Sequence, residues 1–256
     1  MGASLRFLMR AAMAGAFAAV ASTPVLAASQ TYQYRIVHPV YGDIGTYTNI
    51  VEKKSGDVTD VETKMDVAVK VLGVVLYSEA AERSEHWQNG RLLSYHSITD
   101  TNEQRVEVQG EADGNSFVVT SPSGTVVAPA NVHPSNPWSV SVLNTNLMMS
   151  AKSGKLYTVR VRSGEIEDIR TDDSPRKVRQ YEVDSDTRQF VWLDDHGVPV
   201  AFRDEEGETP IDFLLIRYPS GEPGPWPVSP PGGGNAAAVT APPLLAGQAL
   251  NASFGH

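Results

Sequence analysis

The segment Glu85–His96, EHWQNGRLLSYH, decides the fold that this sequence predicts. At its centre, Asn89-Gly90 is a residue pair favoured in two-residue type I′ turns, where both positions adopt positive φ. With this pair as the turn, Gln88 faces Arg91 across two antiparallel strands. The segment therefore predicts a tight β-hairpin.

Alternation of apolar and polar residues extends the strand pattern beyond this hairpin. Met65–Val71, Arg105–Gln109 and Tyr157–Arg162 each carry apolar side chains at every second position. Such runs place one face of a strand on a core and the other in water, as in antiparallel sheets. Short turns rich in glycine, asparagine, aspartate and serine separate them. The pattern predicts an all-β domain, built as a meander of about ten to twelve strands.

The segment Leu72–Gln88 indicates the shape of the sheet. As one strand, at about 3.3 Å per residue, it would reach roughly 55 Å, with Gly73 as a bulge. Neither face is densely aliphatic, since Tyr77, Arg83 and Trp87 share one of them. Long strands with half-polar inner faces are typical of curved sheets that line a cleft. We therefore expect a single, strongly curved antiparallel sheet that forms a half-open barrel or clam.

One segment departs from the period of two. Asn136-Pro137 resembles a helix start, with a capping side chain followed by proline at the first helical position. Val140, Leu143 and Leu147 follow at spacings of three and four. This spacing predicts one short helix near Pro137–Met149.

The two ends of the chain differ from the middle. Arg6 and Arg10 precede the apolar run Ala11–Ala21, and small residues end at Ala27, as in a secretory signal peptide. The stretch from Pro219 holds eight of the 17 prolines and a triple glycine. We expect a signal peptide at 1–27, a β-rich half-barrel domain at 28–218 and a disordered Pro/Gly/Ala-rich tail at 219–256. The protein is then periplasmic or secreted.

Composition argues against several classes of function. Without the two leader arginines, 19 basic residues face 30 acidic ones, a net charge of −11. This balance repels nucleic-acid phosphates, and no later apolar run is long enough to span a membrane. We expect no nucleic-acid partner and no stable membrane insertion after signal removal. The absence of cysteine excludes disulfides, thiolate metal sites and cysteine nucleophiles. No cofactor is expected.

Catalytic and metal motifs are absent from the sequence. It has no G-x-S-x-G elbow and no H-E-x-x-H pair, and its acidic runs do not match a calcium loop. In the hairpin register above, His86 and His96 point to opposite faces and cannot share an ion. The sequence predicts no catalytic residue and no metal site.

Three hypotheses for function remain open. The first is a non-catalytic binding or envelope-associated protein that holds an apolar or amphipathic molecule on the concave face. The second is an extracytoplasmic hydrolase built from Arg83, Glu85 and His96, which share a face in the expected register. The third is a structural partner protein that docks through its tail. The residues expected to bind a ligand under the first hypothesis are Trp87, Tyr95, His96, Trp138 and Trp192.

Turn and aromatic landmarks carry a family resemblance over about residues 32–218. They are Tyr34-Arg35-Ile36, Gly42-Asp43-Ile44-Gly45, Glu85-x-Trp87-x-x-Gly90-Arg91-Leu92, Pro137-Trp138, Ser153-Gly154-Lys155, and Trp192-x-Asp194 with Gly197-Val198-Pro199. The chain resembles a family of uncharacterised exported bacterial β-rich proteins of unknown function. Such families are similar in layout to periplasmic lipoprotein carriers, which implies a curved antiparallel sheet around a helix and an apolar ligand. The chain departs from the carriers in its single short helix and its less apolar strands.

Overall fold

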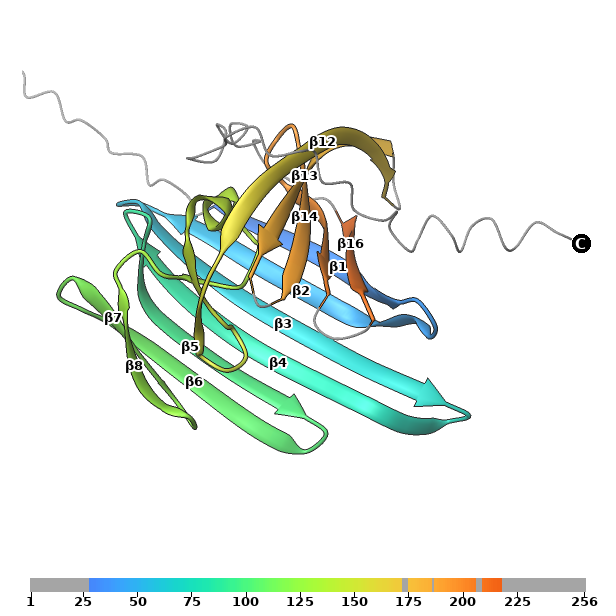
Figure 1. Ribbon diagram of the computed structural model, residues 1–256, viewed down its shortest axis with the longest axis horizontal. Helices are drawn as coiled ribbons and strands as arrows, with labels where there is room; N and C mark the ends of the chain where they lie inside the picture. The colour runs from blue at the N-terminus through green and yellow to red at the C-terminus, as the bar shows by residue number, and fades with distance from the viewer. Residues whose placement is uncertain (1–27, 172–174, 186, 206–208, 218–256) are drawn as a thin grey trace, which may run out of the picture.

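The computed structural model describes residues 28–171, 175–185, 187–205 and 209–217 (Figure 1). The expected signal peptide at 1–27 and tail at 219–256 lie outside these ranges. The strands are β1 (Ala28–His38), β2 (Gly42–Lys54), β3 (Val58–Val71), β4 (Val74–Gln88), β5 (Arg91–Thr101), β6 (Gln104–Asp113), β7 (Ser116–Ser121), β8 (Gly124–Pro129), β9 (His133–Pro134), β10 (Leu147–Met149), β11 (Leu156–Thr158), β12 (Arg160–Arg170), β13 (Pro175–Asp184), β14 (Arg188–Asp194), β15 (Pro199–Asp204) and β16 (Ile211–Arg217). A 3₁₀ helix, η1 (Val140–Asn144), precedes β10. Among the described residues, no helix is long and apolar enough to cross a membrane.

Thirteen of these strands form one antiparallel sheet, which confirms the predicted all-β class. Its order is β12-β13-β14-β15-β16-β1-β2-β3-β4-β5-β6-β7-β8. Two meanders, β1–β8 and β12–β16, therefore meet where the first strand pairs with the last. Residues far apart in sequence lie side by side at this seam, where Tyr34 faces Leu215. The strand total exceeds the expected ten to twelve.

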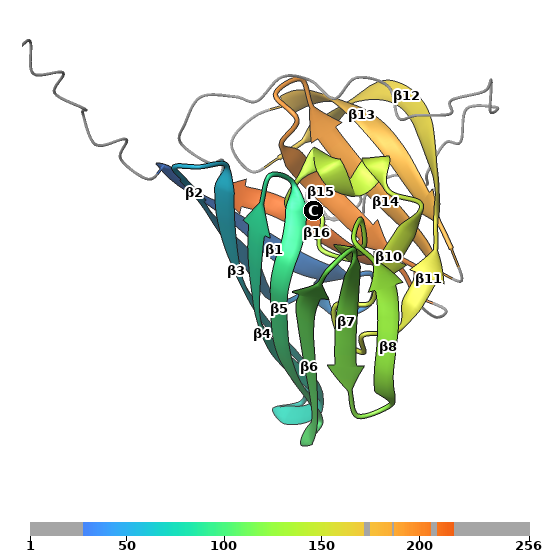
Figure 2. The same cartoon turned by 90° about the vertical axis from the view of Figure 1, so that its left-hand side faces the viewer.

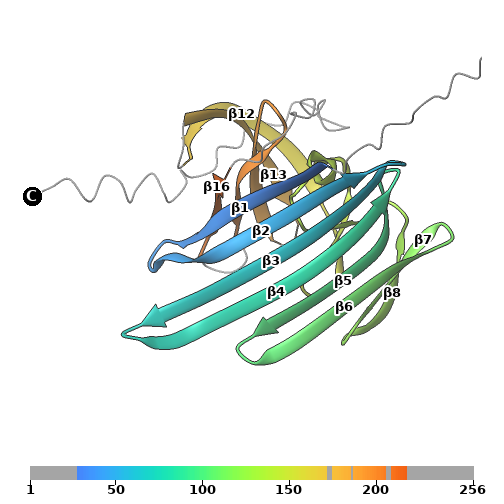
Figure 3. The ribbon, with the colours of Figure 1, turned by 180° about the vertical axis from the view of Figure 1, so that it is seen from behind.

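The sheet is strongly curved and remains open, as expected for a half-open barrel. Its end strands, β8 and β12, are not paired with each other. In Figure 2, η1, β10 and β11 lie between these two ends. The views from front and back show β12–β16 arching over one side of the long β1–β6 strands (Figures 1 and 3). A small sheet with the order β11-β10-β9 completes the fold.

Strand β3 shows how alternation builds the concave face. Val61, Thr63 and Met65 are buried, while Glu62 and Lys64 between them are exposed. Burying one valine or methionine side chain contributes roughly 1.5–3 kcal/mol to the stability of the fold. Register shifts, such as the one between Val69 and Lys70 on this strand, interrupt the ladders. Bulges of this kind bend strands and increase their twist, which helps the sheet to curve.

Strand β14 is buried on both faces. Phe190 and Trp192 belong to the main apolar cluster, and Val191 and Leu193 to a second cluster that contains Leu143 of η1. The continuous apolar run of this strand follows from this double burial. The segment that carries η1, β10 and β11 thus supplies the second layer that the curved sheet needs.

The predicted helix at Pro137–Met149 is wrong in type and length. The helix is a five-residue 3₁₀ turn capped by Ser139, and Leu147–Met149 forms β10 instead. Backbone pairing of β10 with β9 and β11 competes with the helical spacing. Asn136 does not cap this helix, because its side chain enters a buried network described below.

Two details of the long hairpins also differ from the expectation. Gly73 is not a bulge: with Leu72 it forms the β3–β4 turn, where both residues have positive φ. The Asn89-Gly90 turn is confirmed, with Gln88 opposite Arg91. Beyond Trp87, however, a register shift places His86 opposite Ser94. The expected register is therefore wrong by one residue past the bulge.

Candidate functional site

A cleft of about 830 Å³ opens on the concave face of the sheet. Its lining comes from three parts of the chain: β1–β4, the segment from Ser135 to Tyr157, and β13–β16 with their loops. Volumes of this size are typical of small-molecule sites. The cleft is therefore the first candidate for a functional site.

Apolar side chains form one wall of the cleft. On the β15–β16 side, Phe202 and Phe213 stack with ring centroids 4.2 Å apart. Tyr47 of β2 meets both rings edge-on, at 5.5 and 5.7 Å. The wall continues along β3 through Met65, Val67 and Val69. This surface suits a hydrocarbon or aromatic group, because apolar area removed from water stabilises binding.

A charged cluster on β4 lies beside the β3 part of this wall, with Glu79 directly opposite Val67 in the strand register. Glu79 accepts hydrogen bonds from Lys152 Nζ at 2.7 Å, from Thr101 Oγ1 at 3.3 Å and from the Tyr77 hydroxyl. Burial alone would raise the pKa of Glu79, but these donors and the Lys152 charge outweigh it and lower the pKa. Glu79 is therefore a carboxylate whose charge is neutralised within the cluster.

Glu85, six residues further along β4, is a buried carboxylate with three donors. Its Oε2 accepts from the indole N–H groups of Trp87 at 2.8 Å and Trp138 at 2.9 Å, and its Oε1 accepts from Asn136 Nδ2 at 2.9 Å. Burial raises the pKa of Glu85, while these donors and Arg83 oppose the shift. Both oxygens of this carboxylate are thus occupied by structural contacts.

Asn136 connects this carboxylate to the sheet. Its Oδ1 accepts from the Tyr47 hydroxyl at 2.6 Å and from Asn49 Nδ2 at 3.3 Å, and its Nδ2 also donates to Thr63 Oγ1 at 3.0 Å. Asn49, Thr63, Glu85 and Asn136 are all buried. This network anchors the segment before η1 to β2, β3 and β4, and so sets the depth of the cleft.

Arg83 lies between the two carboxylates on the same face of β4 and lines the cleft. It is half-buried, and its Nε is fully buried without a hydrogen-bond partner. Within the described residues, no hydrogen bond or ion pair holds its guanidinium. The nearest acids on its own strand are already bound by other donors, as described above. Arg83 is therefore a half-buried cation that interacts with the Glu85 charge through space, while no hydrogen bond or ion pair of the described residues holds it.

The five residues predicted to bind a ligand lie in two different places: four pack in or against the core, and His96 lies on the outer face of the sheet. Trp87, Tyr95 and Trp192 are buried in the core, Trp138 is partly buried, and none of the four lines the cleft. Their polar atoms serve structural bonds: the Tyr95 hydroxyl donates to the Ala151 carbonyl at 2.7 Å, and Trp192 Nε1 donates to Glu167 at 2.6 Å. These aromatics therefore belong to the core and not to the cleft lining.

His96 lies on the outer face of the sheet, because the register shift reverses its orientation relative to Arg83 and Glu85. Its Nε2 contacts Glu107 Oε1 at 2.9 Å, and its pairing partner is Ser84. Arg83 and Glu85 point inward, so the proposed trio with His96 does not assemble. The expectation that these three residues share a face is wrong.

The same shift places His86 on the outer face with His96, contrary to the expected opposite orientations. His86 Nδ1 contacts Asp60, which also accepts from Lys54. A polar outer groove of about 430 Å³ contains these three residues and Ser94. Ser94 lies opposite His86, but no hydrogen bond joins them. The described residues contain no group of three ligands that could hold a metal.

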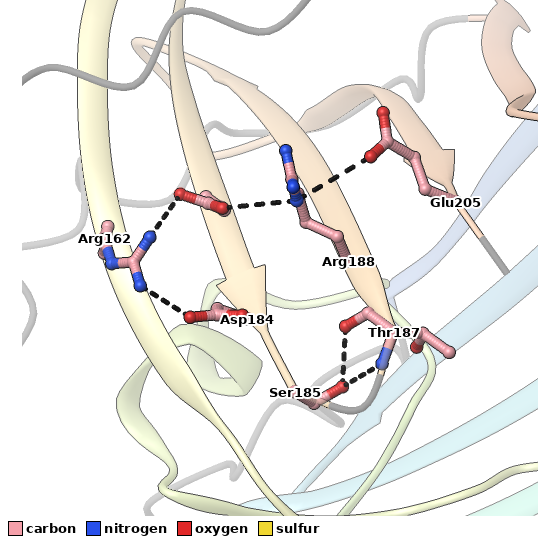
Figure 4. Close-up of polar contacts among 7 residues, drawn as sticks. Arg162, Asp184, Ser185, Thr187, Arg188 and Glu205 are labelled. Atoms are coloured by element: carbon pink, nitrogen blue, oxygen red, sulfur yellow. Dashed lines mark hydrogen bonds and ion pairs between the residues drawn. The ribbon is translucent and has the colours of Figure 1, made fainter.

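An ion-pair network ties the strands at another margin of the cleft (Figure 4). Arg162 of β12 contacts Glu182 at 3.1 Å and Asp184, both on β13. Arg188 of β14 lies 3.7 Å from Glu182 and 3.8 Å from Glu205. Asp184 is thus held by an arginine. These pairs fix the β13–β14 hairpin, whose turn contributes to the cleft lining.

Sequence reasoning placed Arg83 on one strand face with Glu85 but missed its role in the cleft. The signal was an arginine on the same face as Tyr77 and Trp87. The sequence does not indicate that Asn136 and Trp138, about fifty residues further along the chain, donate hydrogen bonds to the neighbouring carboxylate of Glu85. The phenylalanine pair of β15 and β16 was missed as well, because the β1–β16 seam is not visible in local periodicity.

Comparison with known proteins supports the fold. A protein from Brucella abortus, described as a β-barrel-like protein of the domain of unknown function DUF1849, has a crystal structure that matches with a TM-score of 0.57. The match covers 76% of this chain and 98% of that chain, at 10% sequence identity, and so shows a shared fold alone. No curated protein matches the chain.

The sequence itself matches a family model over residues 41–213, from the β1–β2 turn into β16. This family is described as a domain of unknown function, DUF6134. The match spans most of the chain and confirms the expected resemblance to an uncharacterised β-rich family. The chain therefore belongs to the DUF6134 family.

Proposed function

We propose that this protein is an exported, non-catalytic binding protein that holds an apolar or amphipathic molecule in its cleft. The observation that carries the proposal is the apolar wall formed by Tyr47, Phe202 and Phe213 and continued along β3. Each methylene buried against such a wall contributes about 0.8 kcal/mol. The signal-like leader supports a site of action outside the cytoplasm.

Binding of an environment-sensitive alkyl fluorophore tests the proposal. Val67→Asp places a charge on the β3 part of the cleft wall and should abolish the fluorescence increase. Ile50→Asp makes the same change on the outer face and is the matched control, because Ile50 lines the outer groove instead. We expect the control to bind the probe as the unmodified protein does.

Native mass spectrometry of the protein purified from its own host gives the second readout. A retained small molecule, lost from Val67→Asp but not from Ile50→Asp, supports the proposal. Equal probe binding by the unmodified protein and Val67→Asp would contradict it, as would failure of the unmodified protein to bind any alkyl probe.

A further inference from the structure

We infer that the cleft selects amphipathic molecules whose polar end is an anion, a carboxylate or a phosphate, and that Arg83 binds this end. The inference rests on the proposed function and adds the chemical class of the ligand. It begins from the state of Arg83, a half-buried cation that lines the cleft without a hydrogen bond or ion pair in the described structure.

A guanidinium Nε that is buried without a hydrogen-bond partner is costly, because burial removes its water and no protein acceptor replaces it. The two carboxylates nearest to Arg83 on its own strand face accept hydrogen bonds from other residues. Glu85 is held by two indoles and an amide, and Glu79 by Lys152, Tyr77 and Thr101. Arg83 thus retains its donors for a group that enters the cleft.

The charges of the cleft lining point to the same ligand class. Arg83, Lys152, Lys155 and Arg203 contribute four positive charges, against Glu79 and Asp204. Arg203 is neutralised by Asp212 behind the wall. Lys152 is paired with Glu79 as well, so the lining carries a small excess of positive charge in a chain of net charge −9 with its leader. Such a site favours anions over neutral or cationic molecules.

Arginine also supplies the geometry. Its planar fork of N–H donors matches a carboxylate or a phosphate in a bidentate contact, and this contact is strengthened when water is excluded. Both anions are compatible with the site as built. The source of the anion, a fatty acid or a phosphate-bearing lipid, is therefore a question for the experiment.

The strand register indicates how the rest of the ligand lies. Arg83 is opposite Thr63, and Ala81, Glu79 and Tyr77 are opposite Met65, Val67 and Val69 in turn. From Arg83 to Leu76 the strand advances seven residues, or about 23 Å at the usual rise. An apolar chain that starts at Arg83 can follow this β3–β4 surface toward the exposed Leu76 at the mouth. The ligand class is therefore a long-chain anion.

Displacement of the alkyl fluorophore by four amphiphiles of equal chain length tests the inference. The probes are dodecanoate, dodecyl phosphate, dodecyl maltoside and dodecyltrimethylammonium, each below its micellar concentration. We expect the unmodified protein to bind the two anions at least tenfold more tightly than the neutral and cationic amphiphiles. The ratio between dodecanoate and dodecyl phosphate then distinguishes the two sources of anion.

Arg83→Met should remove the preference for anions while leaving dodecyl maltoside affinity unchanged. Arg83→Lys should retain part of it, because the charge remains and the fork is lost. Arg105→Met, an exposed arginine outside the cleft, is the control with the same change of net charge. It should bind all four amphiphiles as the unmodified protein does.

Three outcomes would overturn the inference. Equal affinity of the unmodified protein for anionic and neutral amphiphiles would remove it and leave the proposed function intact. Unchanged anion affinity in Arg83→Met would do the same. Failure of all four amphiphiles to bind would end both proposals. Arg83→Met removes no hydrogen bond, so its unfolding temperature should be no lower than that of the unmodified protein, which excludes misfolding as a cause.

Discussion

Burial of His133 makes the stability of the fold depend on pH. The His133 ring lies against Trp87, with centroids 4.8 Å apart, and burial lowers its pKa from 6.5 to about 4. Between these values the unfolded chain takes up a proton that the folded chain does not. The free energy of unfolding is therefore unaffected by His133 above pH 6.5. As the pH falls toward 4, proton uptake by the unfolded chain lowers this free energy by about 3 kcal/mol in total.

Substitution of this histidine should flatten the pH profile. For His133→Gln we expect the loss of unfolding free energy between pH 7 and 4 to be smaller than for the unmodified protein by about 2–3 kcal/mol. Urea denaturation at a series of pH values measures it. His196→Gln, in the exposed β14–β15 turn, should follow the unmodified protein. Parallel curves for all three proteins would contradict the prediction.

Single residues also mark the limit of what the sequence predicts. Alternation placed Arg83 and Trp87 on one face of a strand, and the structure confirms that face. The contacts of that face depend on Asn136 and Trp138, which reach it across more than forty residues of intervening chain. No local pattern reports such a contact. The concave face was therefore predicted, but the five residues expected to bind a ligand there are not among those that line the cleft.

The β3–β4 turn holds a leucine in a backbone conformation that leucine rarely adopts. Leu72 is fully exposed and has φ of 51°, and Gly73 follows with φ of 83°. The equivalent turn between β4 and β5 uses Asn89 and Gly90 with nearly the same angles. Asparagine tolerates the left-handed region better than leucine does, because its short polar side chain compensates locally.

Exchange of the two side chains should therefore have opposite effects on stability. Leu72→Asn should raise the free energy of unfolding by about 0.5–1 kcal/mol, and Asn89→Leu should lower it by a similar amount. Chemical denaturation of the two variants in parallel gives both values. A change of the same sign in both would show that φ does not govern these turns.

Secondary-structure elements were predictable from the sequence where local residue preferences alone decide the conformation. Alternation in β3 and the Asn89-Gly90 turn needed no distant contact, and both are confirmed. The helix at Pro137–Met149 was wrong because apolar residues at helical spacing serve β10 equally well once β9 and β11 pair with it. The register past Trp87 was wrong because a bulge costs little in a half-buried strand and leaves no mark in composition.

At the scale of the whole molecule, the seam between β1 and β16 joins the two meanders. Gln33 lies opposite Arg217, so Ala28 is about 17 Å further along, at five residues of normal strand rise. A flexible linker of about eight residues from Arg217 to Ala28 spans this distance. A chain permuted in this way, with new ends in the β8–β9 loop between Ala130 and Asn131, should keep the fold, because the contacts across the seam are retained and no hairpin of the large sheet is opened.

The permuted chain should also refold faster than the original order. The seam then becomes a local hairpin, which lowers the mean separation of contacting residues and the entropy of closing the sheet. Stopped-flow refolding, followed by tryptophan fluorescence, measures the two rates. A chain with the same linker but with new ends at Asn89-Gly90 is the control: it opens the β4–β5 hairpin, so it should refold no faster than the original order. Equal rates for permuted and original chains would contradict the expectation.

Placing the first strand beside the last has a consequence for biosynthesis. While the nascent chain grows, β1 can pair with β2, but its other edge waits for β16. At synthesis rates of about 5–20 residues per second, the interval is roughly 10–35 s. Throughout that time the unpaired amides of β1 form a template for any other growing or extended polypeptide. A holdase that shields extended segments is therefore the kind of assistance that this topology calls for.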